Sequence, residues 1–322
     1  MRILITGVHG FVGSNLVSYL APKNEIYGLD IIAPDKEGVV KTFSWEELDA
    51  GRVPEVDAII HLAGKAHDTK NQAAAEVYFK VNTGLTQKIF DYFLKSSAKK
   101  FVFFSTAKAA ADRVEGVLTE DVVPAPVGPY GESKIKAEEY IRASAVWKEM
   151  PDQVGHDGPG AGKQVYIFRP CMIHGPGNKG NLNLLYSVVR KGIPWPLGAF
   201  ENRRTFTSVE NICFAVNGVL TQDVASGIYN MGDDEALSTN ELIEEICKSL
   251  GKKAHIWKFP KGLMTGVAKV GGWLHLPLNP DRLQKLTENY VSSNEKIKKA
   301  LGVERMPVDA REGLKVTLES FK

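Results

Sequence analysis

Residues 3–13 read Ile-Leu-Ile-Thr-Gly-Val-His-Gly-Phe-Val-Gly, a short apolar run that meets a glycine-rich turn and the start of a helical pattern. Gly7, Gly10 and Gly13 recur at intervals of three residues. Small residues at such a turn let a pyrophosphate approach the backbone N–H groups that begin a helix, where the helix dipole favours an anion. Glycine also occurs in purely structural turns, so this signal alone is weak. The stretch predicts a strand–turn–helix unit able to hold a dinucleotide.

The second apolar run, Glu25–Asp30, ends in a carboxylate. In a dinucleotide-binding fold, an acidic residue at this strand end accepts hydrogen bonds from the ribose hydroxyls. The same negative charge would repel a 2′-phosphate, so Asp30 predicts NAD rather than NADP. A turn aspartate that meets no ligand is the alternative, and the neighbouring glycines count against it.

Short apolar runs alternate with longer helical patterns through the first half of the chain. Continuously apolar strands separated by helices are typical of a parallel sheet covered on both faces. We therefore predict an α/β fold with a Rossmann-type, doubly wound parallel sheet, whose ligands lie at the carboxyl ends of the strands. The expected strands are Arg2–Thr6, Glu25–Asp30, Asp57–Leu62, Lys100–Ser105 and Gln164–Arg169. The expected helices are Phe11–Ala21, Ala73–Ser97, Tyr130–Ala145, Thr239–Leu250, Asn294–Leu301 and Asp309–Phe321.

The regular alternation fades after Pro170. Helical patterns are then joined by Gly/Pro-rich segments, which predicts a smaller, mainly helical C-terminal lobe that covers the strand edge. The expected division assigns residues 1–170 and about 205–227 to a dinucleotide-binding domain. It assigns about 171–204 and 228–322 to a substrate lobe, and a Gly/Pro/Asp-rich stretch at 150–163 predicts an exposed loop.

Composition describes an ordinary soluble protein of 322 residues, 43% hydrophobic and 24% charged, with a net charge of +2. Basic and acidic residues are well mixed, which gives no argument for a nucleic-acid or membrane surface. Cys171, Cys213 and Cys247 lie far apart, without metal-ligand spacing, and their odd number argues against a disulfide framework. We expect reduced thiols, a cytoplasmic location and no metal site. No stretch approaches the ~18–20 apolar residues of a membrane span.

The segment Tyr130-Gly-Glu-Ser-Lys134 places a phenol and an ammonium group one helical turn apart, on the same helix face. A tyrosine with its ordinary pKa near ~10 is a poor base at neutral pH. A nearby ammonium, and the charge of an oxidised nicotinamide, both favour the phenolate. Such a pair is common on helix surfaces by chance. Its position after the fourth strand, where Ser105 and Thr106 end that strand, instead predicts hydride transfer between a dinucleotide and an alcohol or ketone.

Together these segments resemble the extended short-chain dehydrogenase/reductase family, particularly its nucleotide-sugar epimerases and reductases. The resemblance covers essentially the whole chain. The motifs that carry it occur in the family's order: Thr6-Gly-x-x-Gly-Phe-Val-Gly13, His61-Leu-Ala-Gly64, Val81-Asn82, Ser105-Thr106, Tyr130-x-x-x-Lys134 and Arg169-Pro170.

The resemblance implies a role for each matching residue. Tyr130 would be the catalytic acid and base, Lys134 would lower its pKa, and Thr106, with Ser105 beside it, would orient the substrate hydroxyl. Lys134 would also bind the nicotinamide ribose. The residues implied to bind the NAD cofactor are Gly7, Gly10, Phe11, Val12, Gly13, Asp30, Leu62, Ala63, Gly64, Asn82, Lys134 and Arg169.

Two further segments resemble the family's diphosphate-binding region. Residues 175–181 look like the segment whose asparagine contacts a nucleotide diphosphate, which implies Asn181. Residues 202–206 look like the segment that carries a diphosphate-binding arginine; Arg204 is our choice, because a guanidinium fits a pyrophosphate. An exposed hairpin is the alternative for that pair of arginines, and Arg282 is a second candidate on a looser match.

The chain also departs from the family's pattern. The 4,6-dehydratase branch carries an Asp-Glu pair after the catalytic threonine, where this chain has Ala107 and Lys108. Without those carboxylates, elimination of water is disfavoured. The Val-Tyr-Gly usual in the next positions is replaced by Ala109–Ala111, which changes the expected wall of the sugar pocket.

The resemblance implies an NAD-dependent epimerase that acts at hexose C4 of a UDP-sugar through a 4-keto intermediate. An NAD(P)H-dependent reductase of a UDP-4-keto-sugar, in surface-polysaccharide synthesis, is the nearest alternative. A non-catalytic NAD-binding sensor or scaffold is a hypothesis of another class, and the retained Tyr130 and Lys134 count against it. A homodimer formed by the helices expected at 73–97 and 130–145 is implied by the resemblance alone.

Overall fold

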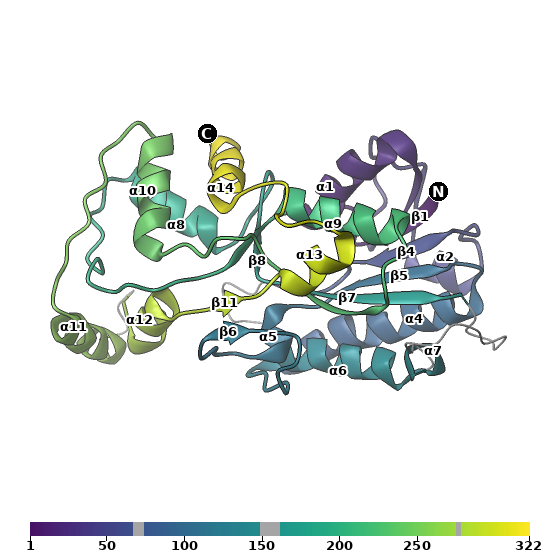
Figure 1. Ribbon diagram of the computed structural model, residues 1–322, viewed down its shortest axis with the longest axis horizontal. Helices are drawn as coiled ribbons and strands as arrows, with labels where there is room; N and C mark the ends of the chain where they lie inside the picture. The colour runs from purple at the N-terminus through teal and green to yellow at the C-terminus, as the bar shows by residue number, and fades with distance from the viewer. Residues whose placement is uncertain (67–73, 149–161, 275–277) are drawn as a thin grey trace.

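A computed structural model describes residues 1–66, 74–148, 162–274 and 278–322 of the chain. Its centre is a seven-stranded sheet in the order β10-β7-β5-β4-β1-β2-β3, with every neighbouring pair parallel (Figure 1). The order reverses between β1 and β4, which is the switch point of a doubly wound fold. These strands are β1 (Arg2–Thr6), β2 (Glu25–Leu29), β3 (Lys41–Phe43), β4 (Ala58–His61), β5 (Lys100–Phe104), β7 (Gln164–Pro170) and β10 (Gly227–Met231).

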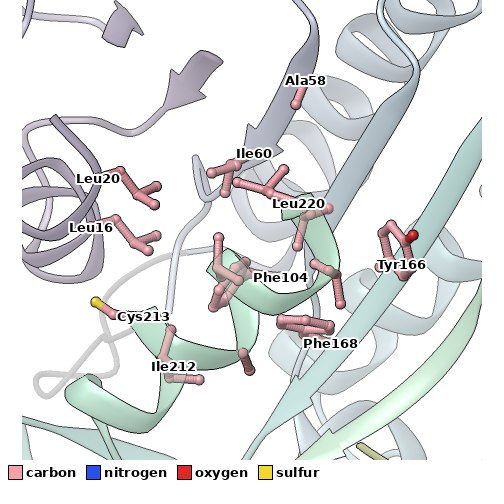
Figure 2. Close-up of a cluster of buried hydrophobic side chains, with 14 of the residues drawn as sticks. Leu16, Leu20, Ala58, Ile60, Phe104, Tyr166, Phe168, Ile212, Cys213 and Leu220 are labelled. Atoms are coloured by element: carbon pink, nitrogen blue, oxygen red, sulfur yellow. The ribbon is translucent and has the colours of Figure 1, made fainter. Parts of the chain in front are cut away.

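Helices cover both faces of this sheet, as a Rossmann-type fold requires (Figure 1). One face carries α1 (Phe11–Leu20), α9 (Val209–Thr221) and α13 (Glu295–Leu301). Figure 2 shows its core, in which Leu16 and Leu20 of α1 and Ile212 of α9 gather with Ile60 and Phe104 of the sheet. The expected α/β architecture is confirmed.

The opposite face carries α4 (Leu85–Lys95) and α6 (Pro129–Ala143). Phe90 and Phe93 of α4 place their rings 5.1 and 5.2 Å from the ring of Phe101 in β5. Ala137 and Ile141 of α6 belong to the same buried cluster. Because α6 also carries Tyr130 and Lys134, this packing fixes the two residues expected to be catalytic relative to the sheet.

Two strands of the main sheet were not expected from the sequence. Strand β3 has only three residues, too few for a recognisable alternation. Strand β10 pairs with β7 along its whole length, from Gly227 to Met231. Residues 228–231 therefore lie in the main sheet, whereas the expected boundary near 227 assigned them to the smaller lobe.

The expected helix over 73–97 is divided. It consists of α3 (Ala75–Tyr78), the π-helical segment η2 (Phe79–Gly84) and α4. The shorter elements elsewhere are η1 (Ala21–Lys23), α2 (Trp45–Asp49), α5 (Ala107–Ala110), α7 (Ala145–Lys148), β6 (Val117–Leu118), β8 (Met172–His174), β9 (Phe206–Ser208) and β11 (Val291–Ser292). The exposed loop expected at 150–163 falls almost entirely outside the described residues.

A group of helices lies at the end of the molecule beyond the carboxyl ends of the strands (Figure 1). They are α8 (Asn181–Arg190), α10 (Thr239–Ser249), α11 (Lys261–Trp273), α12 (Pro280–Thr287) and α14 (Ala310–Glu319). Apolar residues of α8, α10 and α14 share one buried cluster with Phe206 and Leu237. A smaller cluster joins α11 to α12.

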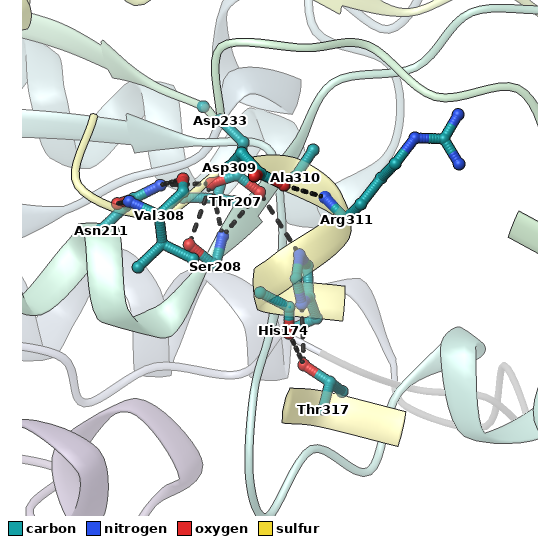
Figure 3. Close-up of polar contacts among 12 residues, drawn as sticks. His174, Thr207, Ser208, Asn211, Asp233, Val308, Asp309, Ala310, Arg311 and Thr317 are labelled. Carbon is teal, nitrogen blue, oxygen red and sulfur yellow. Dashed lines mark hydrogen bonds and ion pairs between the residues drawn. The ribbon is translucent and has the colours of Figure 1, made fainter. Parts of the chain in front are cut away.

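A buried polar cluster ties the helical lobe to the end of the main sheet (Figure 3). The Asp233 carboxylate, just beyond β10, accepts hydrogen bonds from the backbone N–H and hydroxyl of Ser208 and from the Asn211 amide, at 2.8 to 3.1 Å. Nε2 of His174 lies 3.4 Å from the same carboxylate, and its Nδ1 is 2.9 Å from the hydroxyl of Thr317 in α14. Full pairing of these groups offsets the cost of burying them.

Candidate active site

The glycine turn after β1 has the close contacts that a dinucleotide-binding turn needs. Gly7 has φ +70°, a conformation that glycine adopts without strain, and its N–H donates to the carbonyl of Leu29 at 2.8 Å. A Cβ on Gly13 would lie 2.4 Å from the carbonyl oxygen of Gly7. Gly10 is the N-cap of α1, which includes Phe11 and Val12 in its first turn. The turn thus leaves a cradle at a helix N-terminus, which fits a pyrophosphate.

Substituting Gly13 tests that cradle. In Gly13→Ala, the new Cβ would also lie 2.9 Å from Cα and from the carbonyl oxygen of Val8, so backbone must shift. We expect the NAD content of the purified protein to fall by at least about ten-fold, since displacing close-packed backbone costs more than ~1.4 kcal/mol. Mass spectrometry of released ligands measures it. Gly266→Ala, whose Cβ meets nothing within 4 Å, is the control; equal NAD content in both variants would contradict the role of the turn.

Asp30 follows the last residue of β2 and faces the glycine turn. Its Oδ2 accepts the backbone N–H of His9 at 3.1 Å, and its Oδ1 accepts that of Ile31 at 2.8 Å. The carboxylate is therefore held beside residues 7–13, where the sequence places a ribose-binding acid.

A buried hydrogen-bond chain holds the end of β4 against the turn. The hydroxyl of Thr6 is 2.6 Å from Nδ1 of His61, and the hydroxyl of Thr86 is 2.9 Å from its Nε2. Burial, and secondarily the charge of Lys134, hold the pKa of His61 well below its usual range. Ala63 donates its N–H to the Thr6 hydroxyl at 3.0 Å, and Leu62 donates to the Thr6 carbonyl. His61 is thus a neutral structural residue that places Leu62 and Ala63.

The π-helical segment η2 presents Asn82 to the same edge. Its Oδ1 accepts the N–H of Lys65 at 2.7 Å, and its Nδ2 donates to the Lys65 carbonyl and to the hydroxyl of Ser133. A Cβ on Gly64 would lie 3.0 Å from Oδ1 of Asn82 and 3.1 Å from Nζ of Lys134. A π-helical turn, which holds one extra residue, is frequent at functional sites. Here its residue Asn82 links the loop after β4 to α6.

Tyr130 and Thr106 are in contact. Thr106 is buried at the end of β5, and its hydroxyl hydrogen-bonds the Tyr130 phenol. Burial raises the pKa of Tyr130, the Thr106 hydrogen bond opposes that shift, and nearby Tyr78 adds to it. The lowering of this pKa by Lys134 that the resemblance implies stays a prediction for the complex with oxidised cofactor.

Lys134 is buried one helical turn after Tyr130 in α6. Its Nζ donates to the carbonyl of Phe104 at 2.8 Å and lies 4.9 Å from the ring centroid of Phe103. Burial lowers the pKa of Lys134 to about 8, although the charge of Glu138 opposes the shift. The ammonium is therefore close to losing its proton at the upper end of the physiological range.

The Lys134 shift predicts how stability changes with pH. Below about pH 8 the amine is charged in both the folded and the unfolded protein, so the cost of burying the charge is fully present. Between about 8 and the ordinary value of 10.5, the folded state releases this proton first, and the free energy of unfolding rises. Relative to Lys134→Met, wild type should gain about 3 kcal/mol between neutral pH and the upper end of this window. Urea unfolding of wild type, Lys134→Met and the exposed control Lys136→Met measures it; a pH-independent difference would contradict it.

Ser105 and Arg169 meet at Glu138, a residue that sequence reasoning missed. The Ser105 hydroxyl donates to the Glu138 carboxylate, and Nε and Nη2 of Arg169 donate to it at 2.6 to 3.2 Å. Both charged side chains are buried. In the described part of the chain, Nη1 of Arg169 has no hydrogen-bond partner. The signal was the spacing: Glu138 stands four residues after Lys134, on the helix face that α6 buries.

The expected diphosphate-binding residues lie on the smaller lobe. Arg204 pairs by its backbone with Leu237, and its Nη1 donates to the carbonyl of Lys285 in α12 at 2.7 Å. Arg282 is exposed on that same helix. Asn181 is exposed at the first position of α8. The structure thus brings Arg204 and the helix of Arg282 together and places Asn181 on a separate element.

Cys171 stands between Pro170, the last residue of β7, and Met172, the first of β8. It follows β7, and burial raises the pKa of its thiol to about 12, while the charges of Arg204 and Lys108 oppose that shift. The side chain of Arg204 is therefore near the carboxyl end of β7, and Cys171 is a thiol rather than a thiolate nucleophile. Among the residues that the structure describes, no cluster of His, Cys, Asp or Glu could hold a metal ion. In the same residues, no helix is long and apolar enough to cross a bilayer.

Comparisons with known proteins agree with this geometry. The chain is 29% identical to UDP-glucose 4-epimerase from Vibrio cholerae over 99% of this chain and 95% of that protein. It is 26% identical to N-acetyl-α-D-glucosaminyl-diphospho-ditrans,octacis-undecaprenol 4-epimerase from Escherichia coli O157:H7, over 92% and 85%. UDP-glucuronic acid 4-epimerase from Bacillus cereus, solved with NAD, shares the fold at a TM-score of 0.74 and 19% identity, over 100% and 96%.

The sequence profile of the NAD-dependent epimerase/dehydratase family matches residues 3–232, which contain the glycine turn, Asp30 and the Tyr130–Lys134 pair. This match covers well over half of the chain. The protein is therefore an enzyme of the NAD-dependent epimerase/dehydratase family.

Proposed function

We propose that this protein interconverts the C4 epimers of a hexose carried on a nucleoside diphosphate, with uridine as the expected base. One observation carries the proposal: the Tyr130 phenol, the Thr106 hydroxyl and the Lys134 amine gather at the strand edge that holds the glycine turn. Close contacts connect the glycine turn to Lys134: Gly7 lies against Ala63, and the next residue, Gly64, lies against Lys134. The named 4-epimerases among its relatives support the same reaction.

In this mechanism Tyr130 moves the proton and Thr106 positions the sugar. Tyr130, as phenolate, takes the proton from the C4 hydroxyl, and Thr106 hydrogen-bonds the same oxygen. Lys134 supplies positive charge that stabilises the phenolate. NAD, when bound, would exchange a hydride with C4 of the sugar. Tyr130 then returns the proton when the 4-keto sugar, turned over in the pocket, is reduced on its other face.

The smaller lobe supplies the diphosphate site in this proposal. Arg204 is held by the Lys285 carbonyl near the end of β7, and it provides a bidentate donor for a pyrophosphate. Arg282 and Asn181 are further candidates at the rim. Residues 171–204 and the region after Met231 would then form the substrate lobe, apart from α13, which packs on the main sheet.

Ligand release and an unsupplemented assay test the proposal. The purified protein should retain NAD and interconvert 4-epimers of a UDP-sugar with no cofactor added. The panel should include UDP-linked glucose, N-acetylglucosamine and glucuronic acid, and a polyprenyl-diphosphate-linked N-acetylhexosamine. Turnover only of a 4-keto sugar, and only with added NAD(P)H, would instead establish the reductase alternative.

A further inference from the structure

Helix α11 lies at the far end of the helical lobe and buries only one side. In Figure 1 it occupies the extremity of the molecule, with α12 between it and the rest. Its buried residues are Met264, Ala268 and Gly271. Met264 and Ala268 pack with Leu283 of α12 and with Leu197. The remaining surface of the helix has no covering element among the described residues.

That uncovered surface is apolar. Its large side chains are Leu263 (54% exposed), Val267 (45%), Val270 (55%), Trp273 (80%) and Leu274 (52%). Leu263, Val267, Val270 and Leu274 are spaced by four, three and four residues, so they form a single stripe along the helix axis, and Trp273 flanks it. We call these five residues the α11 stripe. A continuous exposed stripe of this kind marks an interaction surface, unlike single apolar residues scattered over a protein.

Two aromatic side chains lead into the helix. Trp257 is 52% exposed and packs edge-on against Phe259, with ring centroids 5.7 Å apart. Phe259 stands just before Pro260, the N-cap of α11. Partly exposed indole rings are favoured where water meets the headgroups of a bilayer.

The segment that carries the stripe is basic. From residue 251 to residue 280 the sequence contains no Asp or Glu and five lysines: Lys252, Lys253, Lys258, Lys261 and Lys269. All five are exposed. The chain as a whole carries only +2, so this positive charge is a local concentration that the overall balance hides. An apolar face on a basic segment complements an anionic, apolar partner.

We propose that the α11 stripe docks the enzyme onto an anionic lipid bilayer, with α11 lying in the headgroup region. The stripe enters the interface, and the lysines in or next to the helix, Lys258, Lys261 and Lys269, lie near anionic headgroups. A second copy of this chain fits less well, because a two-fold contact through α11 would bring two equally basic segments together. The inference concerns a surface outside the catalytic residues, and it stands apart from the proposed epimerase activity.

Flotation with lipid vesicles tests the proposal. The full-length protein should float with vesicles of equimolar phosphatidylcholine and phosphatidylglycerol. It should not float with phosphatidylcholine alone, and roughly 0.5 M salt should reduce its binding. A wild-type protein that does not bind the anionic vesicles overturns the proposal.

Variants then locate the surface. Leu263→Gln/Val267→Gln/Val270→Gln keeps helix-compatible residues and should lower partitioning by about ten-fold or more, because it removes the inserted stripe. Lys261→Glu/Lys269→Glu should do the same through charge. The matched control is Val40→Gln/Leu184→Gln, at positions 62% and 58% exposed, one just before β3 and one in α8, which should bind as wild type does.

Folding and assembly are followed in the same samples. Circular dichroism and NAD content should match wild type in every variant. Undiminished vesicle binding by the stripe variant would overturn the proposal. So would light scattering that shows wild type as a dimer which the same variant converts to monomers, since the stripe would then be a contact between copies.

Discussion

Tyr130→Phe should lower the rate of epimer interconversion by about 10²–10⁴-fold, the usual contribution of a positioned acid and base. The substitution removes the phenolic oxygen, which hydrogen-bonds Thr106, and it keeps the ring that packs edge-on against Tyr78 at 6.5 Å between centroids. The loss should therefore fall on the chemical step, with little change in fold or retained NAD. Steady-state assays with the UDP-sugar that wild type converts best, together with ligand release, separate the two effects.

Tyr140→Phe is the matched control, because it removes a phenolic oxygen from the same helix outside the site. The Tyr140 hydroxyl donates to Asp91 at 2.7 Å, and its loss should cost about 1 kcal/mol of stability and leave turnover within about two-fold. If Tyr130→Phe turned over as fast as Tyr140→Phe, the proton would have to move through another group, and the proposed mechanism would be wrong.

Arg169→Met should lower the free energy of unfolding by about 3–5 kcal/mol. The substitution leaves the buried Glu138 carboxylate with the Ser105 hydroxyl and no positive partner in contact. Glu138→Gln should destabilise by a similar amount, because the buried guanidinium then loses its counter-charge. Urea unfolding measures both, and NAD content shows whether the strand edge is also disturbed.

The double variant Glu138→Gln/Arg169→Met separates pairing from packing. Its cost should be well below the sum of the two single variants, because neither buried charge is then left alone. Glu139→Gln changes the next residue, which is exposed, and should stay within about 0.5 kcal/mol of wild type. Additive single effects would show that the two side chains do not act as a pair.

The sequence predicted those parts of the fold that are encoded locally. Strand β1 has the expected bounds, and the glycine turn with the Tyr130–Lys134 pair pointed to the edge where the candidate site lies. Strand β10 and helix α11 were not predicted. Strand β10 is short and is defined by its pairing with β7. Helix α11 contains Gly262, Gly266, Gly271 and Gly272, and glycine propensity assigns such a segment to a loop. In both segments, tertiary packing determines the secondary structure.

The finer features of the site are also set by distant contacts. A charged residue on a helix is usually exposed, so the spacing from Lys134 was too weak a signal to single out Glu138 before Arg169 and Ser105 were seen to meet it. Apolar periodicity could not predict the π-helical segment η2 either. Its conformation accompanies the hydrogen bonds that Asn82 makes to Lys65 and Ser133. The burial of Lys134 could not be predicted for the same reason, because it depends on packing against Phe103 and Phe104 of β5.

The cluster around Asp233 bears on the order in which the protein can mature during synthesis. Its members come from residues 174, 208–211, 233, 308 and 317, so the last of them leave the ribosome long after the sheet strands. Until residues 308 and 317 arrive, His174 and Asn211 lack partners that α14 and the segment before it supply. A nascent chain would thus hold a nearly complete nucleotide-binding half beside an unfinished seam, which could close only after residues 308 and 317 have left the ribosome.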